Sequence, residues 1–138
     1  PVIAFGYDFG NHITSLTDPR GKVWTFNYSG NGSLLWEKDP LNHQTSYSYT
    51  VGYTDITDAN NHTTRHNYTN GRLSSVVDAQ TYSASFGYDS SNNRTSVTDQ
   101  AGETSSLTYD SRGNVLTVTD ALGHTTTTPT TGLTCPSR

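Results

Sequence analysis

Apolar and aromatic residues recur along the chain in short runs, two positions apart, with polar residues between them. The segment TSSLTY at 104–109 is typical, with Leu107 and Tyr109 alternating with Ser and Thr. Successive side chains of a β-strand point to opposite faces, so this alternation predicts strands with one solvated face. No window keeps the 3.6-residue period of an amphipathic helix. The pattern therefore predicts an all-β chain.

The alternating runs belong to an internal repeat. Six tyrosines open successive units, at separations of 21, 21, 19, 20 and 21 residues, and an Asp follows each Tyr after 9 to 11 residues. A Gly or Asn lies near the seventh position before most of these Asp residues. The repeating residues are Tyr7, Tyr28, Tyr49, Tyr68, Tyr88 and Tyr109, and Asp18, Asp39, Asp58, Asp78, Asp99 and Asp120. Three residue classes that recur together over six units predict a repeat architecture.

Each unit predicts two short strands and two turns. Two positions before the Tyr, on the same strand face, lie Phe5, Phe26, Phe86 and Leu107 in four of the units. One turn begins at the repeating Asp, followed by Gly21, Asn42, Asn61, Gly102 or Gly123, which tolerate positive φ. The other turn is the Gly/Asn group after each Tyr. We therefore expect tandem β-hairpins of about 21 residues that form a curved antiparallel sheet, a β-solenoid-like shell segment.

This architecture explains an unusual composition. Only 30% of the residues are hydrophobic, whereas Ser and Thr together number 40 of 138. Taken alone, so few aliphatic residues favour disorder. A stack of hairpins, however, needs only one thin apolar face per unit, and abundant Thr suits the strands. The repeat thus predicts a folded array over 1–128, followed by a non-repeat tail at 129–138.

Charge and composition exclude several classes of protein. The net charge is −4 and the pI near 5.6, so no basic surface for nucleic acid is expected. No run approaches the roughly 18 apolar residues of a membrane span, and no signal peptide opens this stretch. The single cysteine, Cys135, excludes a disulfide framework and a cysteine-rich zinc site.

The motifs resemble those of the YD-repeat or Rhs-repeat family. The best matches are Tyr7-Asp8-Phe9-Gly10-Asn11, residues 88–99 and residues 109–124. The resemblance implies β-sheet shells in which hairpins spiral around a cavity. Bacterial Rhs proteins and C components of insecticidal toxin complexes enclose a toxin domain in this way, and teneurins are adhesive relatives. It therefore implies a secreted or cell-surface location, most simply bacterial, and neighbouring YD repeats as partners.

The resemblance also sets what the array lacks. The catalytic aspartates that release the cargo of the bacterial shells have no counterpart, and Asp18-Pro19 and Asp39-Pro40 are turn positions. Six units are too few to close a shell, so we expect either a segment of a longer protein or a short array that pairs with further copies. Residues 1–6 match the end of a preceding unit. The tail 129–138 is either a Thr/Pro-rich linker or a frame-shifted end.

No candidate catalytic, cofactor or metal site emerges from the residues. His43, His62 and His124 share one slot, four residues after the repeating Asp, where another unit has Lys22, so a solvated turn position is expected. We expect His66 to be packed and His12 to be exposed. Calcium binding by the acidic turns is the less favoured interpretation of these aspartates, because the nine-residue calcium-binding repeat is missing. The chain is therefore not expected to be an enzyme, and no cofactor is expected.

Five sequons would be glycosylation acceptors in a eukaryotic secreted protein. They begin at Asn27, Asn31, Asn61, Asn67 and Asn93.

Three functions remain open. The leading one is a structural segment of a β-shell that encloses or displays another domain. The second is a self-assembling extracellular fibre subunit that joins head to tail through its exposed sheet edges. The third is a module that binds carbohydrate or a cell-surface partner through aromatic residues such as Trp24 and Trp36.

Overall fold

The computed structural model describes residues 2–128, all of them in strands, turns and short connections. The tail at 129–138, with Cys135, lies outside the described residues. The strands are β1 (Ala4–Tyr7), β2 (Ile13–Thr17), β3 (Val23–Tyr28), β4 (Leu34–Lys38), β5 (Gln44–Thr50), β6 (Tyr53–Thr57), β7 (Thr63–Thr69), β8 (Arg72–Val77), β9 (Ser83–Tyr88), β10 (Arg94–Thr98), β11 (Thr104–Tyr109), β12 (Val115–Thr119) and β13 (Thr125–Thr127).

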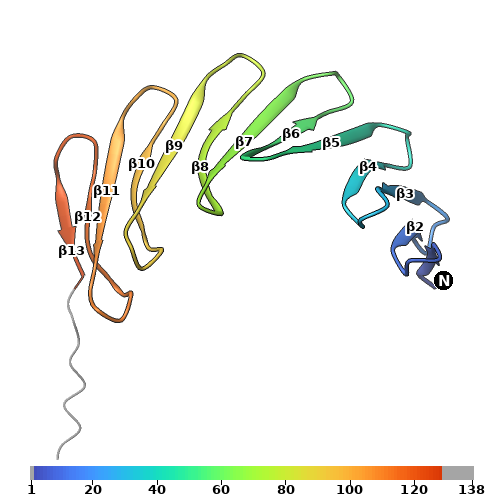
Figure 1. Ribbon diagram of the computed structural model, residues 1–138, viewed down its shortest axis with the longest axis horizontal. Helices are drawn as coiled ribbons and strands as arrows, with labels where there is room; N and C mark the ends of the chain where they lie inside the picture. The colour runs from blue at the N-terminus through green and yellow to red at the C-terminus, as the bar shows by residue number, and fades with distance from the viewer. Residues whose placement is uncertain (1, 129–138) are drawn as a thin grey trace, which may run out of the picture.

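The strands form one open sheet in which each strand pairs only with its neighbours in sequence. The order runs from β1 to β13 without a crossover, and every pair is antiparallel. The hairpins follow one another along a twisted arch, with β1 at one end and β13 at the other (Figure 1). The prediction of an all-β array of tandem hairpins in a curved antiparallel sheet is thereby confirmed.

This sheet is a single layer without a hydrophobic core. No residue between 2 and 128 is buried, and the apolar side chains are half-buried at most. Fold-determining contacts therefore lie between adjacent strands. Stability in such an array is approximately a sum over neighbouring units.

The unequal spacing of the tyrosines has a structural cause. In the common 21-residue unit, a β-bulge follows the turn after the Tyr: Tyr28 pairs with Leu34, whereas Asn27 pairs with Trp36. The turn between β7 and β8 is one residue shorter and keeps its bulge, which gives a separation of 20 from Tyr68 to Tyr88. The turn between β5 and β6 is equally short, and its register runs without a bulge. The separation from Tyr49 to Tyr68 is therefore 19.

The register assigns side chains to two faces, because residues directly opposite each other on paired strands lie on the same face. Phe5 faces Leu16, and Leu16 faces Trp24, so all three share one face with the repeating tyrosines. We call it the tyrosine face. It carries Phe5, Tyr7, Leu16, Trp24, Phe26, Tyr28, Glu37, Tyr47, Tyr49, Ile56, His66, Tyr68, Val76, Phe86, Tyr88, Val97, Leu107, Tyr109 and Val118.

The opposite surface is the threonine face, made by the alternate residues of the same strands. Pairs of threonine hydroxyls bridge adjacent strands on it, with Oγ1–Oγ1 distances of 2.9 Å for Thr57 and Thr63 and 2.8 Å for Thr98 and Thr104. Thr119 and Thr125 repeat this contact at 2.8 Å. Threonine therefore supports both the strand conformation and the pairing of strands beside the turns.

Candidate functional site

Two rows of turns line the long edges of the sheet. The aspartate edge holds the turns at 18–22, 39–43, 58–62, 78–82, 99–103 and 120–124. The tyrosine edge holds those at 8–12, 29–33, 50–53, 69–72, 89–93 and 110–114. The sequence suggested two different connections, yet ten of the twelve turns have one and the same geometry.

In this shared geometry, the first residue of the turn closes a five-residue loop at both ends. For Asp58, the backbone N–H donates to the carbonyl of His62, and the carbonyl accepts from Asn61. The fourth residue has positive φ, 64° for Asn61. Gly, Asn or Asp adopts this conformation most easily. The recurrence of Gly and Asn at this position therefore reflects a backbone requirement.

The first side chain of the turn completes it by accepting backbone hydrogen bonds. Oδ1 of Asp58 accepts from the N–H groups of Asn60 and His62, each at 2.8 Å. The His62 N–H is the main cause that holds the pKa of Asp58 below its ordinary value, with further help from Asn60 and the His62 ring. A hydrogen bond from the fourth following residue likewise leads the causes that lower the pKa of Asp8, Asp18, Asp89, Asp110 and Asp120.

The fifth residue of several turns binds the second carboxylate oxygen. His43, His62 and His124 place Nδ1 at 2.8, 3.2 and 2.9 Å from Oδ2 of their Asp. Their side chains are 60 to 76% exposed, in agreement with the expected turn position, but they also brace the turn. In other turns Asn93 and Asn114 donate from Nδ2 to the equivalent oxygen.

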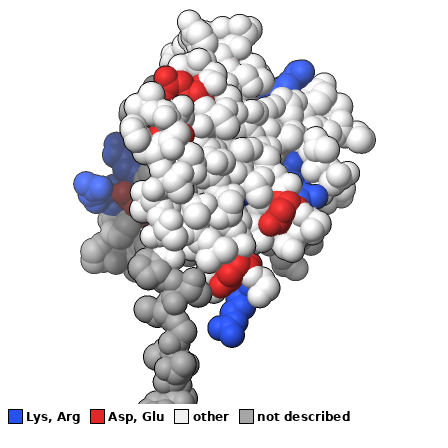
Figure 2. All heavy atoms as spheres, turned by 90° about the vertical axis from the view of Figure 1, so that its left-hand side faces the viewer, with Lys and Arg blue, Asp and Glu red and all other residues white. Residues whose placement is uncertain are grey.

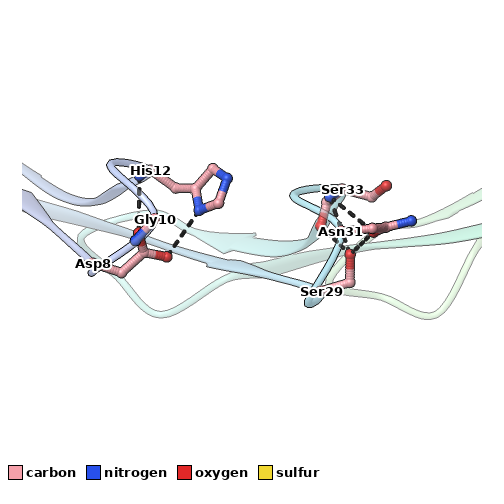
Figure 3. A network of polar contacts seen from close by, with 6 residues as sticks. All are labelled: Asp8, Gly10, His12, Ser29, Asn31 and Ser33. Atoms are coloured by element: carbon pink, nitrogen blue, oxygen red, sulfur yellow. Dashed lines mark hydrogen bonds and ion pairs between the residues drawn. The ribbon is translucent and has the colours of Figure 1, made fainter.

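Figure 3 shows two adjacent turns of the tyrosine edge, one that begins with Asp8 and one in which Ser29 and Asn31 replace the Asp. Oδ1 of Asp8 accepts from the N–H groups of Gly10 and His12 at 2.8 and 2.9 Å. In the next turn, Ser29 Oγ and Asn31 Oδ1 divide that role and both accept from the N–H of Ser33. Different side chains thus accept from the same backbone group, the N–H of the fifth turn residue.

His12 departs from the exposed position expected for it. Its ring stacks on Tyr28, with centroids 4.8 Å apart and an interplanar angle of 22°. It also lies against Gly32, where an added Cβ would come within 2.9 Å of Nε2. Gly32 has a φ of +83°, so both its backbone and its surroundings favour glycine. His12 therefore connects two successive turns of the tyrosine edge.

The repeating tyrosines stand at or next to the ends of the odd-numbered strands, and the repeating aspartates directly follow the even-numbered ones. Phe5, Phe26, Phe86 and Leu107 lie on β1, β3, β9 and β11, on the tyrosine face with the tyrosines. Tyr49 and Tyr109 donate hydrogen bonds to the carbonyls of Leu34 and Arg94, at 2.8 and 2.7 Å. These hydroxyl contacts could not be predicted from the sequence. It shows the spacing of the tyrosines but not the β-bulges at which the accepting carbonyls lie.

The tyrosine face has a hollow of about 460 Å³ across β2 to β5. Trp24 and Phe26 of β3 line one side, Thr45 of β5 and the neighbouring His43 line the other, and Glu37 of β4 lies between them. The hydroxyl of Tyr47 donates to Glu37 Oε1 at 3.0 Å. Desolvation, followed by this bond to a carboxylate, raises the pKa of Tyr47.

The threonine face carries two contacts between a cationic side chain and an aromatic ring. Arg65 donates from Nε and Nη2 to the two carboxylate oxygens of Asp55, at 2.7 and 2.8 Å, and its guanidinium lies 3.9 Å from the centre of the Tyr53 ring. The Lys38 ammonium lies 5.0 Å from the centre of the Trp36 ring. The surface at the β13 end carries few charges. Figure 2 shows a broad uncharged area there, with charged groups near its margins.

Between residues 2 and 128 there is no group of three or more His, Cys, Asp or Glu side chains that could hold a metal ion. The same part of the chain has no helix that is long and apolar enough to cross a membrane.

The five sequon asparagines differ in their surroundings. Asn27 is exposed on the threonine face, and Asn31 and Asn61 are exposed in turns. Asn67 and Asn93 are half-buried, and Nδ2 of each donates a hydrogen bond, to Ser75 Oγ and Asp89 Oδ2 respectively. Glycosylation therefore stays a proposal, for which the first three offer freer amide groups than the last two.

The second half of the chain matches the model of the family described as RHS Repeat, over residues 68–104 and 88–126. Residues 68–126 are RHS repeats by this match. The hairpins of the first half repeat the turns, Tyr positions and register of this segment, except for the shorter, unbulged turn between β5 and β6. No curated protein matches the chain.

Among solved structures, the crystal structure of TcdB2–TccC3–Cdc42 contains a similar chain. The similarity has a TM-score of 0.69 at 18% sequence identity and covers 86% of the present chain. The present chain corresponds to only 7% of that chain. The likeness shows that the curved hairpin sheet has the fold of a segment of a much larger protein.

Proposed function

We propose that this RHS-repeat array is a structural segment of a β-shell that encloses or displays another domain, and that it has no enzymatic activity of its own. One observation carries the proposal: the sheet is curved, one layer thick and without a buried residue in its described part. Such a sheet keeps an apolar tyrosine face half in contact with solvent. In a continuous wall, further repeats would extend the sheet beyond β1 and beyond β13. The tyrosine face would then line the inside of the wall and be shielded from bulk solvent.

In the full-length protein, the proposal includes an enclosed toxin domain, a secreted or cell-surface location and a bacterial source. Its support is the match of residues 68–126 to the RHS-repeat model together with the structural likeness to a much larger chain. Cryo-electron microscopy of the full-length gene product tests it. A hollow particle whose wall contains this segment is expected, and an isolated, extended array without a cavity would contradict it.

The isolated 138-residue chain offers a simpler test of the folded segment. Far-ultraviolet circular dichroism should give a β-sheet spectrum with a cooperative thermal transition. Small-angle scattering should give the elongated arch of Figure 1. A disordered or helical spectrum would refute the structural role, because a shell segment has to fold as hairpins.

Self-assembly through sheet edges is the second proposal, and the first strand favours it. β1 pairs only with β2, and its side chains Phe5 and Tyr7 are 48% and 59% exposed. An unpaired apolar edge strand is a template for another strand. The partner would be a further copy of the chain or another YD repeat.

The direction of the strands limits how copies can join. β1 and β13 run the same way, because twelve antiparallel pairs separate them. A head-to-tail fibre with a continuous tyrosine face would therefore need a parallel β13–β1 pair, whereas two β1 strands related by a two-fold axis would pair antiparallel. Negative-stain microscopy distinguishes fibres from dimers. Phe5→Lys should abolish either β1-mediated form, while Leu41→Lys, which changes an exposed turn residue, should not.

Carbohydrate or cell-surface binding is the third proposal. Trp24 lines the hollow on the tyrosine face, whereas Trp36 lies on the threonine face with Lys38, so the two do not form one platform. A glycan array would test Trp24 by itself, with Trp24→Ala as the variant and Trp36→Ala as the control. Loss of glycan binding only in the Trp24 variant supports this proposal, and the absence of any binding rejects it.

A further inference from the structure

Glu37 occupies a position that is apolar in every other unit. Two residues before the repeating Asp, the other five units have Leu16, Ile56, Val76, Val97 and Val118. The register places Glu37 among them on the tyrosine face, opposite Phe26 on one side and Thr45 on the other. A carboxylate therefore replaces an aliphatic side chain in the middle of the apolar face.

The carboxylate charge of Glu37 is only partly balanced by its neighbours. Oε1 accepts one hydrogen bond from Tyr47, and no Lys or Arg of the described residues forms an ion pair with Glu37. Lys38 follows it directly in sequence and also lines the hollow, but its ammonium lies on the opposite face, 5.0 Å from the centre of the Trp36 ring. A carboxylate can accept several hydrogen bonds, so this one retains unused capacity toward a donor from outside.

The hollow around Glu37 supplies the rest of a cation site. Its volume of about 460 Å³ lies in the size range of small-ligand pockets. The rings of Trp24 and Phe26 line it beside the carboxylate, and Asp39 adds a second negative charge at the rim. Aromatic rings attract cations, and a planar guanidinium both stacks on a ring and donates in parallel to a carboxylate.

We propose that the hollow bounded by Trp24, Phe26, Glu37 and Thr45 binds an arginine side chain of a polypeptide partner. Charge complementarity selects a cationic occupant, and the flat aromatic wall beside a carboxylate selects guanidinium over ammonium. The site lies on one face of four adjacent strands. It would therefore exist in the isolated chain whether or not the array forms part of a shell.

The test is a titration of the 138-residue chain with the peptide acetyl-Gly-Arg-Gly-amide, followed by NMR of the Trp24 indole and the Glu37 amide. Saturable shifts at these groups are expected. The same peptide with citrulline, which keeps the shape and loses the charge, should bind at least about tenfold more weakly. Unmoved signals, or equal affinity for the citrulline peptide, would overturn the proposal. Tighter binding of a neutral sugar than of the peptide at these groups would do so too.

Two variants locate the site. Glu37→Val introduces the residue of three other units, so it should fold, as circular dichroism would verify, and should lose binding. Glu37→Gln keeps the shape and should also weaken binding at least about tenfold. Glu103→Gln makes the same charge change in a turn outside the hollow and should leave binding unaltered. Unchanged affinity in Glu37→Gln, or equal losses in both Gln variants, contradicts a specific site at Glu37.

Discussion

Tyr109 donates a hydrogen bond from its phenol hydroxyl to the backbone carbonyl of Arg94, 2.7 Å away. Arg94 begins β10 and pairs with Tyr88, the tyrosine of the preceding unit, at a β-bulge. Tyr49 makes the same contact to Leu34, which pairs with Tyr28 at the equivalent bulge. In these two units the repeating tyrosine therefore joins one hairpin to the irregular end of the previous one. Its recurrence reflects a polar contact as well as an apolar surface.

Tyr109→Phe removes this contact and keeps the ring. We expect a loss of about 0.5 kcal/mol in the free energy of unfolding, the low end for a hydrogen bond, because this contact is exposed and water can replace the hydroxyl at the Arg94 carbonyl. Urea denaturation followed by circular dichroism measures it. Tyr88→Phe is the matched control, since the Tyr88 hydroxyl makes no hydrogen bond in the described part of the chain. Equal effects of the two changes would show that the hydroxyl of Tyr109 does not matter.

Asp58→Ala should loosen the turn between β6 and β7. It removes the acceptor of the Asn60 and His62 amides, so both amides should exchange with solvent much faster while the strands stay protected. Asp58→Asn keeps an acceptor oxygen at the same position and should preserve most of the protection. Hydrogen exchange measured by NMR compares the two. Equal protection in Asp58→Ala and the wild type would mean that the backbone alone maintains the turn.

Acid should destabilise the array through its turns. The pKa values of Asp8, Asp58, Asp110 and other turn carboxyls lie below the ordinary value of 3.8 in the folded chain. The folded state then binds fewer protons than the unfolded one, so this stabilisation is complete at neutral pH and is lost as pH falls through the folded pKa values. We expect the free energy of unfolding to be level from pH 7 to 5 and to drop below about pH 4.

Denaturant titrations between pH 7 and pH 2.5 measure this dependence. A variant in which Asp58 and Asp110 are both Asn should show a shallower fall, because two of the titrating groups are gone. A free energy that stays level down to pH 2.5 in the wild type would contradict the role of the carboxylates.

Gly71→Ala should destabilise the hairpin of β7 and β8 by about 1 kcal/mol, because a left-handed conformation costs an L-residue about that much. Gly71 has a φ of +74°, next to Asn70 at +52°, and no atom would contact an added Cβ. Backbone strain is therefore the only cost. Gly30→Ala, also open to solvent but without positive φ, should be nearly neutral. Thermal denaturation of the two variants separates strain from the mere loss of a glycine.

The repeat spacing predicted the hairpins and their shared apolar face because both depend on local alternation. The cause of the shorter spacing in the units that begin at Tyr49 and Tyr68 could not be predicted from this alternation. The missing bulge between Tyr49 and Thr54 depends on register across two strands, which the sequence does not display. Glu37 was visible as an exception to the pattern, but the hollow beside it requires Trp24 and Thr45 to lie on the two strands that flank the strand of Glu37.

In the turns, too, features that depend on one or two residues were predictable from the sequence, whereas contacts between segments distant in sequence were not. Gly21 and Asn42 were recognisable as positive-φ residues from composition alone, and both have positive φ in the structure. That Asp8 and Asp18 open identical turns on opposite edges was missed, because the residues that follow them differ. The stacking of His12 on Tyr28 was missed for a related reason, since it joins two turns that lie beside each other only in the folded sheet.

Among residues 2–128, Thr81 is the only β-branched residue in the left-handed region of backbone conformation. Its φ is +71°, whereas the same position of the other aspartate-edge turns holds Gly or Asn. Such a conformation is costly for a β-branched side chain. Thr81→Gly should therefore raise the free energy of unfolding by about 1 kcal/mol, although glycine loses more backbone entropy on folding. Thr81→Asn should raise it less, and Asn42→Thr should lower it by a similar amount. Melting temperatures test the series, and a Thr81→Gly variant no more stable than the wild type would show that the turn between β8 and β9 bears no such strain.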